Sequence, residues 1–190
     1  QQRARADIRA AGAQALAAME ERGGSGIVLA GRPYHVDPEI NHGIPELIAA
    51  YGLTVLTEDC LPIGFVPKRP VRVNDQWVYH SRLYTAAEFV CGRDDLELVQ
   101  LNSFGCGLDA VTTDEVCELL ESGGKLYTCL KLDEVNNLGA VRIRIRSLLA
   151  AVALRRERGI RSVALTAPYR RVHYTRPMQK AGYTILAPQM

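Results

Sequence analysis

The sequence has little lysine, few aromatic residues and no long apolar run. Only four of its 190 residues are lysines, and the formal net charge is +2 at pH 7. Acidic residues are interspersed with the arginines, so the composition does not indicate a nucleic-acid-binding protein. No apolar run is long enough to span a membrane, and no secretory leader precedes the cysteines. These features predict a cytoplasmic protein that binds neither nucleic acid nor membrane.

Two common motifs of metal and nucleotide chemistry are also missing. The five cysteines form no C-x-x-C pair, which excludes a zinc ribbon or a ferredoxin cluster by local spacing. There is no G-x-x-x-x-G-K-[ST] motif, so hydrolysis of ATP by a P-loop is not expected. An odd number of cysteines indicates a reducing compartment. Because the chain begins at Gln1 and ends without punctuation, we expect it to be a segment of a longer polypeptide.

Apolar runs alternate with helical patterns along most of the chain. Strands are expected at residues 26–31, 53–57, 96–101 and 125–132, separated by helical segments. A βαβ series with right-handed crossovers gives a parallel sheet between helices. The predicted fold class is therefore α/β, a Rossmann-like three-layer α/β/α fold with a mainly parallel sheet of about four strands. We expect a lead-in helix at 1–25, the α/β domain at 26–158, and a C-terminal extension or the start of an adjoining domain at 159–190. Helical spacing of apolar residues from 138 to 152 predicts a helix that ends near 158, although residues 142–146 alternate like a strand. Two short apolar runs follow, at 163–165 and 183–186.

The stretch 98–110 is the central motif around which the other predicted elements are placed. It runs as a buried strand that breaks at Cys106, between Gly105 and Gly107, into the start of a helix. The two glycines free the backbone on both sides of the thiol, and the amides of a helix start favour a thiolate. Cys106 is thus predicted to carry chemistry, whereas Cys91, Cys117 and Cys129 fall inside elements and are predicted to pack as small hydrophobic residues.

Polar residues collect where the predicted strands end. Ligands bind such parallel sheets outside the carboxyl ends of the strands. The segments there hold residues 32–42, 58–60, 102–109 and 133–137. The first of them is too polar and too interrupted by proline to be expected to form a helix or strand. A functional site is predicted at this edge, with Cys60 as a second candidate thiolate.

Several alternatives stay open for these residues. Residues 105–110 also match the dinucleotide pattern G-x-G-x-x-A, followed by acidic residues one strand later. His35 and His42 are candidates for acid, base or ligand, or are polar loop residues bonded to backbone groups. Arg32, with Tyr34 nearby, holds a phosphate or carboxylate, or pairs with Asp37 or Glu39. The arginines of 142–158 are most simply a solvated or interface face.

Three motifs together resemble a known family. They are Gly31-Arg32-Pro33-Tyr34-His35 with Asp37-Pro38-Glu39-Ile40-Asn41, the stretch from Asn102 to Ala110, and Asp133-Glu134 leading to Asn137-Leu138-Gly139-Ala140. In this combination, the chain resembles the large proteins related to 2-hydroxyacyl-CoA dehydratase activases, from about residue 26 to 190. It looks like one dehydratase-like α/β unit, without the actin-like ATPase modules of that family.

The resemblance implies a function and a set of site residues. It implies an iron–sulfur protein that takes part in ATP-coupled low-potential electron transfer, with a 4Fe–4S cluster that another domain helps to hold and ATP bound only by other domains. The implied metal ligands are Cys106 and Cys60. His35 and Asp109 are the expected catalytic residues, and Arg32, Tyr34, Gly105 and Gly107 the expected cofactor-binding residues.

The expected partners are other domains of a longer chain, including the ATPase modules, and an acyl-CoA substrate. Leu108 departs from the proline that the family pattern has there. The chain is expected to be part of an iron–sulfur enzyme or of its activator, and to be inactive alone. The alternative is a Rossmann-like nucleotide- or CoA-binding module without a redox centre.

Overall fold

The computed structural model describes most of the chain in six ranges. These ranges are residues 2–62, 77–103, 107–132, 138–158, 162–164 and 184–186. Gly105, Cys106 and the predicted loop 133–137 lie outside the described residues. The site below is therefore built from the residues on either side of them.

The described chain forms a parallel sheet of four strands. The strands are β1 (Gly26–Ala30), β2 (Thr54–Thr57), β3 (Leu96–Asn102) and β4 (Thr128–Lys131). Their order is β2-β1-β3-β4, with β1 paired to both β2 and β3. β1 is fully buried and β3 nearly so, as expected for strands that helices cover on both faces. The predicted α/β fold class is confirmed.

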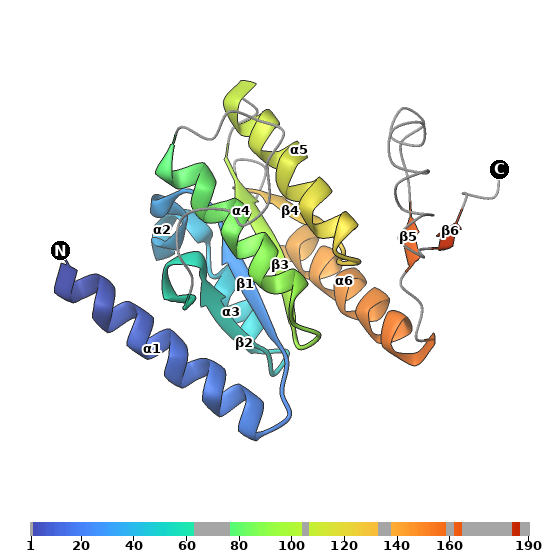
Figure 1. Cartoon of the computed structure of the whole chain (residues 1–190), viewed down its shortest axis with the longest axis horizontal. Helices are drawn as coiled ribbons and strands as arrows, with labels where there is room; N and C mark the ends of the chain where they lie inside the picture. The colour runs from blue at the N-terminus through green and yellow to red at the C-terminus, as the bar shows by residue number, and fades with distance from the viewer. Residues whose placement is uncertain are drawn as a thin grey trace.

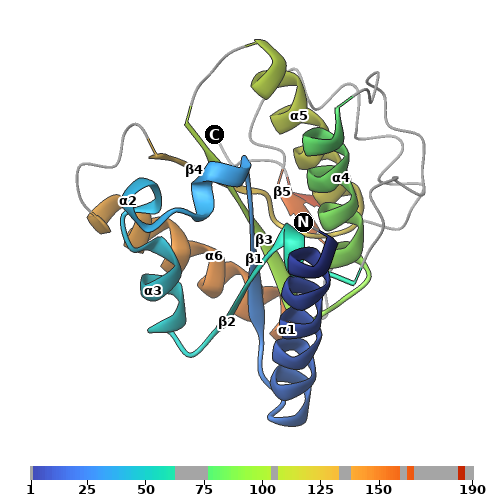
Figure 2. The same cartoon turned by 90° about the vertical axis from the view of Figure 1, so that its left-hand side faces the viewer.

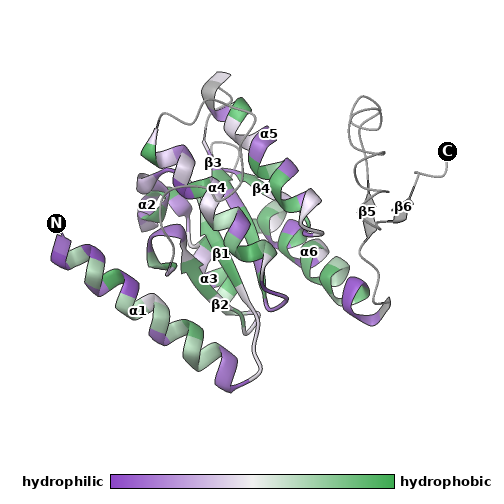
Figure 3. Ribbon diagram, viewed as in Figure 1, coloured by the Kyte–Doolittle hydropathy of each residue, from purple (hydrophilic) through white to green (hydrophobic). Residues whose placement is uncertain are grey.

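Helices cover both faces of the sheet (Figure 1). One face packs against α3 (Ile44–Ala49) and α6 (Leu138–Arg158); the other packs against α1 (Gln2–Glu21), α4 (Val78–Cys91) and α5 (Gly107–Ser122). Figure 2 shows the two helical layers on opposite sides of the strands. Alternate strand residues serve the two layers, since Val28 and Leu98 belong to one apolar cluster and Ile27 and Val99 to the other. In Figure 3 the apolar colour is concentrated between these layers.

The segment after β1 was predicted to be too polar and proline-rich for any element, and this prediction is wrong. It forms a 3-10 turn, η1 (Pro33–Val36), and a short helix, α2 (Pro38–Asn41). Each element has its proline in the first turn, where the missing N–H costs nothing. Asp37 caps α2, with its side chain accepting a 2.9 Å hydrogen bond from Glu39 N. The prolines here begin helices.

The helix predicted over the arginine-rich segment is confirmed. The alternation from Arg142 to Arg146 imitates a strand, but Val141 and Ile145 are buried at helical spacing while Arg142, Arg144 and Arg146 are exposed. Cys91 and Cys117 lie in helices and Cys129 in a strand, as predicted.

Two further short strands follow α6. β5 (Ser162–Ala164) and β6 (Thr184–Leu186) pair with each other in parallel. They fall on the two apolar runs noted in the sequence, and the proposed domain boundary at 158 stays a prediction. At the other end of the chain, α1 packs closely against η2 (Glu58–Cys60): a Cβ on Gly12 would lie 2.1 Å from the carbonyl oxygen of Cys60. Only glycine fits there.

None of the helices in the described ranges is long and apolar enough to cross a membrane.

Candidate functional site

The strand order places a topological switch point between β1 and β3, and we call the carboxyl edge of the sheet at this point the crevice. The chain leaves β1 for α3 on one face of the sheet, and it leaves β3 for α5 on the other face. Where neighbouring parallel strands send their connections to opposite faces, the loops diverge and a ligand site opens at the carboxyl edge. The residues after β1 and those after β3 therefore face each other across this crevice, which is where the sequence predicted a site.

An ion pair bridges the crevice. Arg32 Nη2 lies 2.7 Å from Oδ1 of Asp109, a residue of the first turn of α5 that is 77 positions further along the chain. The Asp109 side chain is only 4% exposed and that of Arg32 is 31% exposed. The hydrogen bond to Asp109 raises the pKa of Arg32. Arg32 thus pairs with Asp109 and not with Asp37 or Glu39, the partners that its own loop offered.

One carboxylate oxygen of Asp109 has no hydrogen-bond partner among the described residues. Its Oδ2 is buried, and no group of the described residues donates a hydrogen bond to it. The guanidinium of Arg32 also lies over the ring of Tyr79 from α4, 5.3 Å from its centroid, which is a cation–π distance. Burial, with the Asp109 charge, raises the pKa of Tyr79, so the phenol stays protonated. The crevice is thus lined by a cation, a buried carboxylate and a neutral phenol.

A second bridge joins His35 of η1 to Ser103 after β3. His35 Nδ1 accepts a 3.0 Å hydrogen bond from the backbone N–H of Arg32, so the ring proton resides on Nε2. Nε2 then donates to Ser103 Oγ at 2.8 Å. Burial and the nearby Arg32 lower the pKa of His35 to about 4, so the ring is neutral at pH 7.

This tautomer decides what Ser103 can do. The lone pair of the imidazole faces the Arg32 amide, so His35 does not accept the proton of Ser103, as a serine nucleophile requires. Ser103 instead accepts from His35 and keeps its own O–H to donate to another group. Ser103 had no predicted role. Its position directly after a buried strand is the feature of the sequence that could have identified it as a site residue.

Two further predicted residues of this edge, Tyr34 and Gly107, lie on the surface. Tyr34 is 38% exposed and its ring meets that of His35 edge-on, with centroids 4.6 Å apart. Gly107, the first residue of α5, is exposed, and a Cβ there would meet nothing within 4 Å. Space for a ligand therefore exists beside both residues, and their cofactor-binding roles stay predictions.

Glu58, at the end of β2, is a titratable group that the sequence placed at the edge without a role. It is only 5% exposed. Burial raises its pKa to about 7, although Arg82 of α4 lies 3.4 Å away and opposes the shift. Arg82 also pairs with Asp59, so its charge is shared between two carboxylates. An acid of this kind has the pKa expected of a group in a functional site.

A cavity of about 100 Å³ lies beside the crevice, at the ends of β1 and β2. Its apolar lining comes from Leu29, Val36, Pro45, Val55 and Leu101. Its polar lining comes from Gly31, Arg32, His35, Asn41, Thr57 and Glu58. Buried polar side chains around an apolar cavity are typical of small-molecule sites.

The described residues do not by themselves form a metal site. The Cys60 thiol donates to the carbonyl of Thr57 at 3.2 Å and accepts from the Thr57 N–H at 3.1 Å, and Cys60 packs against the apolar cluster under α1. Within the described ranges, no group of three or more His, Cys, Asp or Glu side chains could hold a metal ion. Cys106, the main predicted ligand, lies outside those ranges.

Comparison with known proteins relates the first third of the chain to a family. No curated protein matches the chain. Residues 1–61, which run from α1 through β1, β2 and η2, match the profile of a family described as "CoA enzyme activase uncharacterised domain". This match includes Arg32, Tyr34, His35 and Glu58 of the candidate site. It confirms the similarity to the activase-related family that the motifs indicated.

Proposed function

We propose that the chain is a dehydratase-like domain of an activase-related iron–sulfur protein, and that it takes part in ATP-coupled low-potential electron transfer. The observation that carries the proposal is the β1/β3 crevice. The segment of Cys106 begins directly after Ser103 and ends at Gly107, where α5 starts. The family match over residues 1–61 supports the same direction.

Each side chain of the crevice has a defined task in this proposal. A bound cluster would supply one-electron chemistry, with the Cys106 thiolate as its ligand from this chain. Arg32 and Asp109 hold the loop after β1 against the start of α5 through their 2.7 Å ion pair. Neutral His35 fixes Ser103 as a hydrogen-bond donor toward the crevice. The protein part of the site is thereby set before any partner binds.

The shortage of ligands in the described chain shapes the proposal. Cys60 is held by Thr57 and has no group of companion ligands in the described ranges. We therefore expect this chain to contribute only part of a ligand set, which another domain or subunit completes. ATP hydrolysis belongs to other modules, and an acyl-CoA is the expected substrate of the complete system.

The test is anaerobic reconstitution with iron and sulfide, followed by iron analysis and absorption spectroscopy. Wild type should gain iron and a charge-transfer band, and Cys106→Ser should lose both. Cys91→Ser is the matched control, because a serine there can still donate to the carbonyl of Leu119, which Cys91 contacts at 3.5 Å. If wild type and the longer parent chain both stay free of iron, the electron-transfer proposal is wrong.

A second candidate is a nucleotide- or CoA-binding module without a redox centre. Oδ2 of buried Asp109, to which no described residue donates, favours it, because an unused buried acceptor suits the hydroxyl or amide donor of a ligand. This candidate predicts that Gly107→Trp abolishes binding of CoA or a nucleotide while Cys106→Ala leaves it unchanged. The cluster proposal predicts that Cys106→Ala removes iron.

A further inference from the structure

The cavity at the ends of β1 and β2 has a size that selects small ligands. At about 100 Å³ it exceeds the roughly 10–15 Å³ that one water needs and falls below the ~150 Å³ of an apolar cavity that accepts benzene. A molecule of about five non-hydrogen atoms is the size that fits. Val36 is 55% exposed and the Arg32 side chain 31% exposed, so the cavity opens at these two residues.

The deep polar groups of the cavity are one donor and one acceptor. Asn41 is 2% exposed and its Oδ1 accepts from the Gly43 N–H at 3.1 Å, so its amide NH₂ has no partner among the described residues. Glu58 accepts one long hydrogen bond, 3.4 Å, from Arg82, and it also accepts from its own backbone N–H and from that of Gly31. A carboxyl group has about four acceptor positions, so Glu58 keeps acceptor capacity.

The other polar side chains of the lining each have a partner, which for Arg32 is the carboxylate of Asp109. Both ring nitrogens of His35 have partners, in Arg32 N and Ser103 Oγ. The hydroxyl of Thr57 lies 3.2 Å from the Cys60 thiol. The lining therefore offers a ligand the Asn41 amide and the Glu58 carboxyl for hydrogen bonds, and apolar contacts with Leu29, Val55 and Leu101.

The charges around the cavity disfavour a charged ligand of either sign. A carboxylate would meet Glu58, which is mostly ionised above its pKa of about 7, and a cation would meet the guanidinium of Arg32. Transfer of an isolated charge into such a site is costly, whereas a neutral group that both donates and accepts has its bonds satisfied. A primary carboxamide has this chemistry: its NH₂ donates to Glu58 and its carbonyl accepts from Asn41.

We propose that this cavity binds a small neutral carboxamide with a short alkyl chain, held between Asn41 and Glu58. The site is separate from the predicted cluster ligand, so the inference does not rest on the proposed electron transfer. It adds a ligand class that neither the family match nor the crevice assigns.

The test is a ¹H–¹⁵N NMR titration of the full chain with propionamide at pH 8, where Glu58, with its pKa of about 7, is mostly ionised. Propionamide should bind with a Kd of about 1–10 mM, as expected for five atoms, and shift the side-chain NH₂ signals of Asn41. Propionate and propionamidinium have the same number of non-hydrogen atoms as propionamide, a planar end group and a charge, and both should bind at least tenfold more weakly. Cys106→Ser should bind propionamide like wild type, which separates this proposal from the cluster proposal.

Asn41→Asp is the diagnostic variant. It removes the NH₂ donor but keeps the oxygen that accepts from Gly43 N, so the turn is preserved. Binding of propionamide should fall at least tenfold. Asn102→Asp makes the same change at the end of β3, outside the cavity lining, and should bind like wild type. No saturable shift in wild type, equal binding of the charged analogues, or unchanged binding by Asn41→Asp would each overturn the proposal.

Discussion

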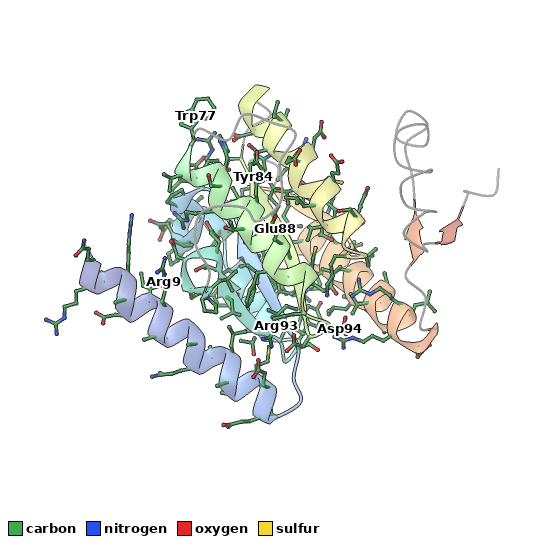
Figure 4. The ribbon with its side chains drawn as sticks, viewed as in Figure 1. Arg9, Trp77, Tyr84, Glu88, Arg93 and Asp94 are labelled. Carbon is green, nitrogen blue, oxygen red and sulfur yellow. The ribbon has the colours of Figure 1, made fainter. Side chains whose placement is uncertain are left out.

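The two ends of the same sheet use buried charge in different ways. At the amino end, Lys125 Nζ donates to the carbonyls of Arg93 and Leu96 and to Glu97, and Arg155 bonds both Glu97 and the carbonyl of Gly124. In Figure 4, Arg93 and Asp94 lie at this end and Trp77 at the opposite one. These contacts tie the starts of β3 and β4 to the last turns of α6. Buried cations here donate hydrogen bonds to backbone carbonyls next to the ends of strands and helices.

At the carboxyl end, charged and polar groups bond one another, and some of their hydrogen-bond donors and acceptors stay unused among the described residues. Asp109 has an unused oxygen, Glu58 has a raised pKa, and Asn41 has an unused NH₂ among the described residues. Unsatisfied buried groups cost stability, and a fold retains them where they serve a ligand. At the amino end one oxygen of Glu97 also lacks a partner among the described residues, but Lys125 and Arg155 there bond backbone carbonyls, so we interpret the amino end as built mainly for stability and the carboxyl end for binding.

The largest expected effect is at the amino end. Lys125→Met removes a buried cation, leaves two carbonyls without their donor and leaves Glu97 with Arg155 alone, so the free energy of unfolding should fall by about 3–5 kcal/mol. Urea unfolding at pH 7 measures it. Lys131→Met, an exposed position of β4, should change it by less than about 0.5 kcal/mol. Similar losses in the two variants would show that Lys125 does not secure this end.

The next effect has the opposite sign and lies at the carboxyl end. Glu58 has a pKa of about 7 in the folded protein against 4.5 unperturbed, so between these pH values the folded state holds more protons. Stability from this group is therefore present below pH 4.5 and is lost as the pH rises to 7. Glu58→Gln should be more stable than wild type at pH 8, by an amount on the order of 2–3 kcal/mol, and this gain should disappear near pH 4.5.

The measurement for Glu58 compares variants because His35 works against it. The pKa of His35 is lowered to about 4, so its contribution is lost as the pH falls from 6.5 toward 4 and partly masks that of Glu58 in wild type. Urea unfolding of Glu58→Gln and wild type at several pH values cancels the His35 term. Glu46→Gln, on the exposed side of α3, is the control and should follow wild type. A difference that does not vary with pH would contradict the raised pKa.

This contrast between the ends also marks what the sequence could reveal. The four strands, the main helices and the carboxyl edge as site follow from apolar periodicity and strand ends, and β3 and β4 were placed to within three residues. The sequence could not show that Arg32 pairs with Asp109, since the partners are 77 residues apart and closer acids compete.

Burial of single charges was equally hidden. Lys125 follows two glycines at the start of the predicted strand 125–132 and Glu58 adjoins Asp59 after another, so neither position indicates burial in the sequence. Only the packing of α6 and α4 buries them. The start of helices at Pro33 and Pro38 was missed because proline was taken as a breaker, while in the first turn it is compatible with a helix.

The smallest expected effect concerns the ion pair across the crevice. Asp109→Asn keeps an oxygen that accepts from Arg32 and removes only the charge, and Arg32 is partly exposed, so water already screens the pair. The free energy of unfolding should fall by about 1 kcal/mol at pH 7. Because Asp114→Asn makes the same change at an exposed position of α5, it should cost less than half of that.

A double-mutant cycle decides whether this loss belongs to the pair. With Arg32→Gln as the second change, the coupling energy should be about 0.5–1 kcal/mol, most of the single-variant loss. A coupling near zero would mean that Asp109 acts through the helix start alone and does not hold the loop after β1. A gain in stability on Asp109→Asn would mean that desolvation of the carboxylate outweighs its pairing. The crevice would then be strained in the absence of its ligand, and the contrast between the two ends of the sheet would be larger than the pair alone suggests.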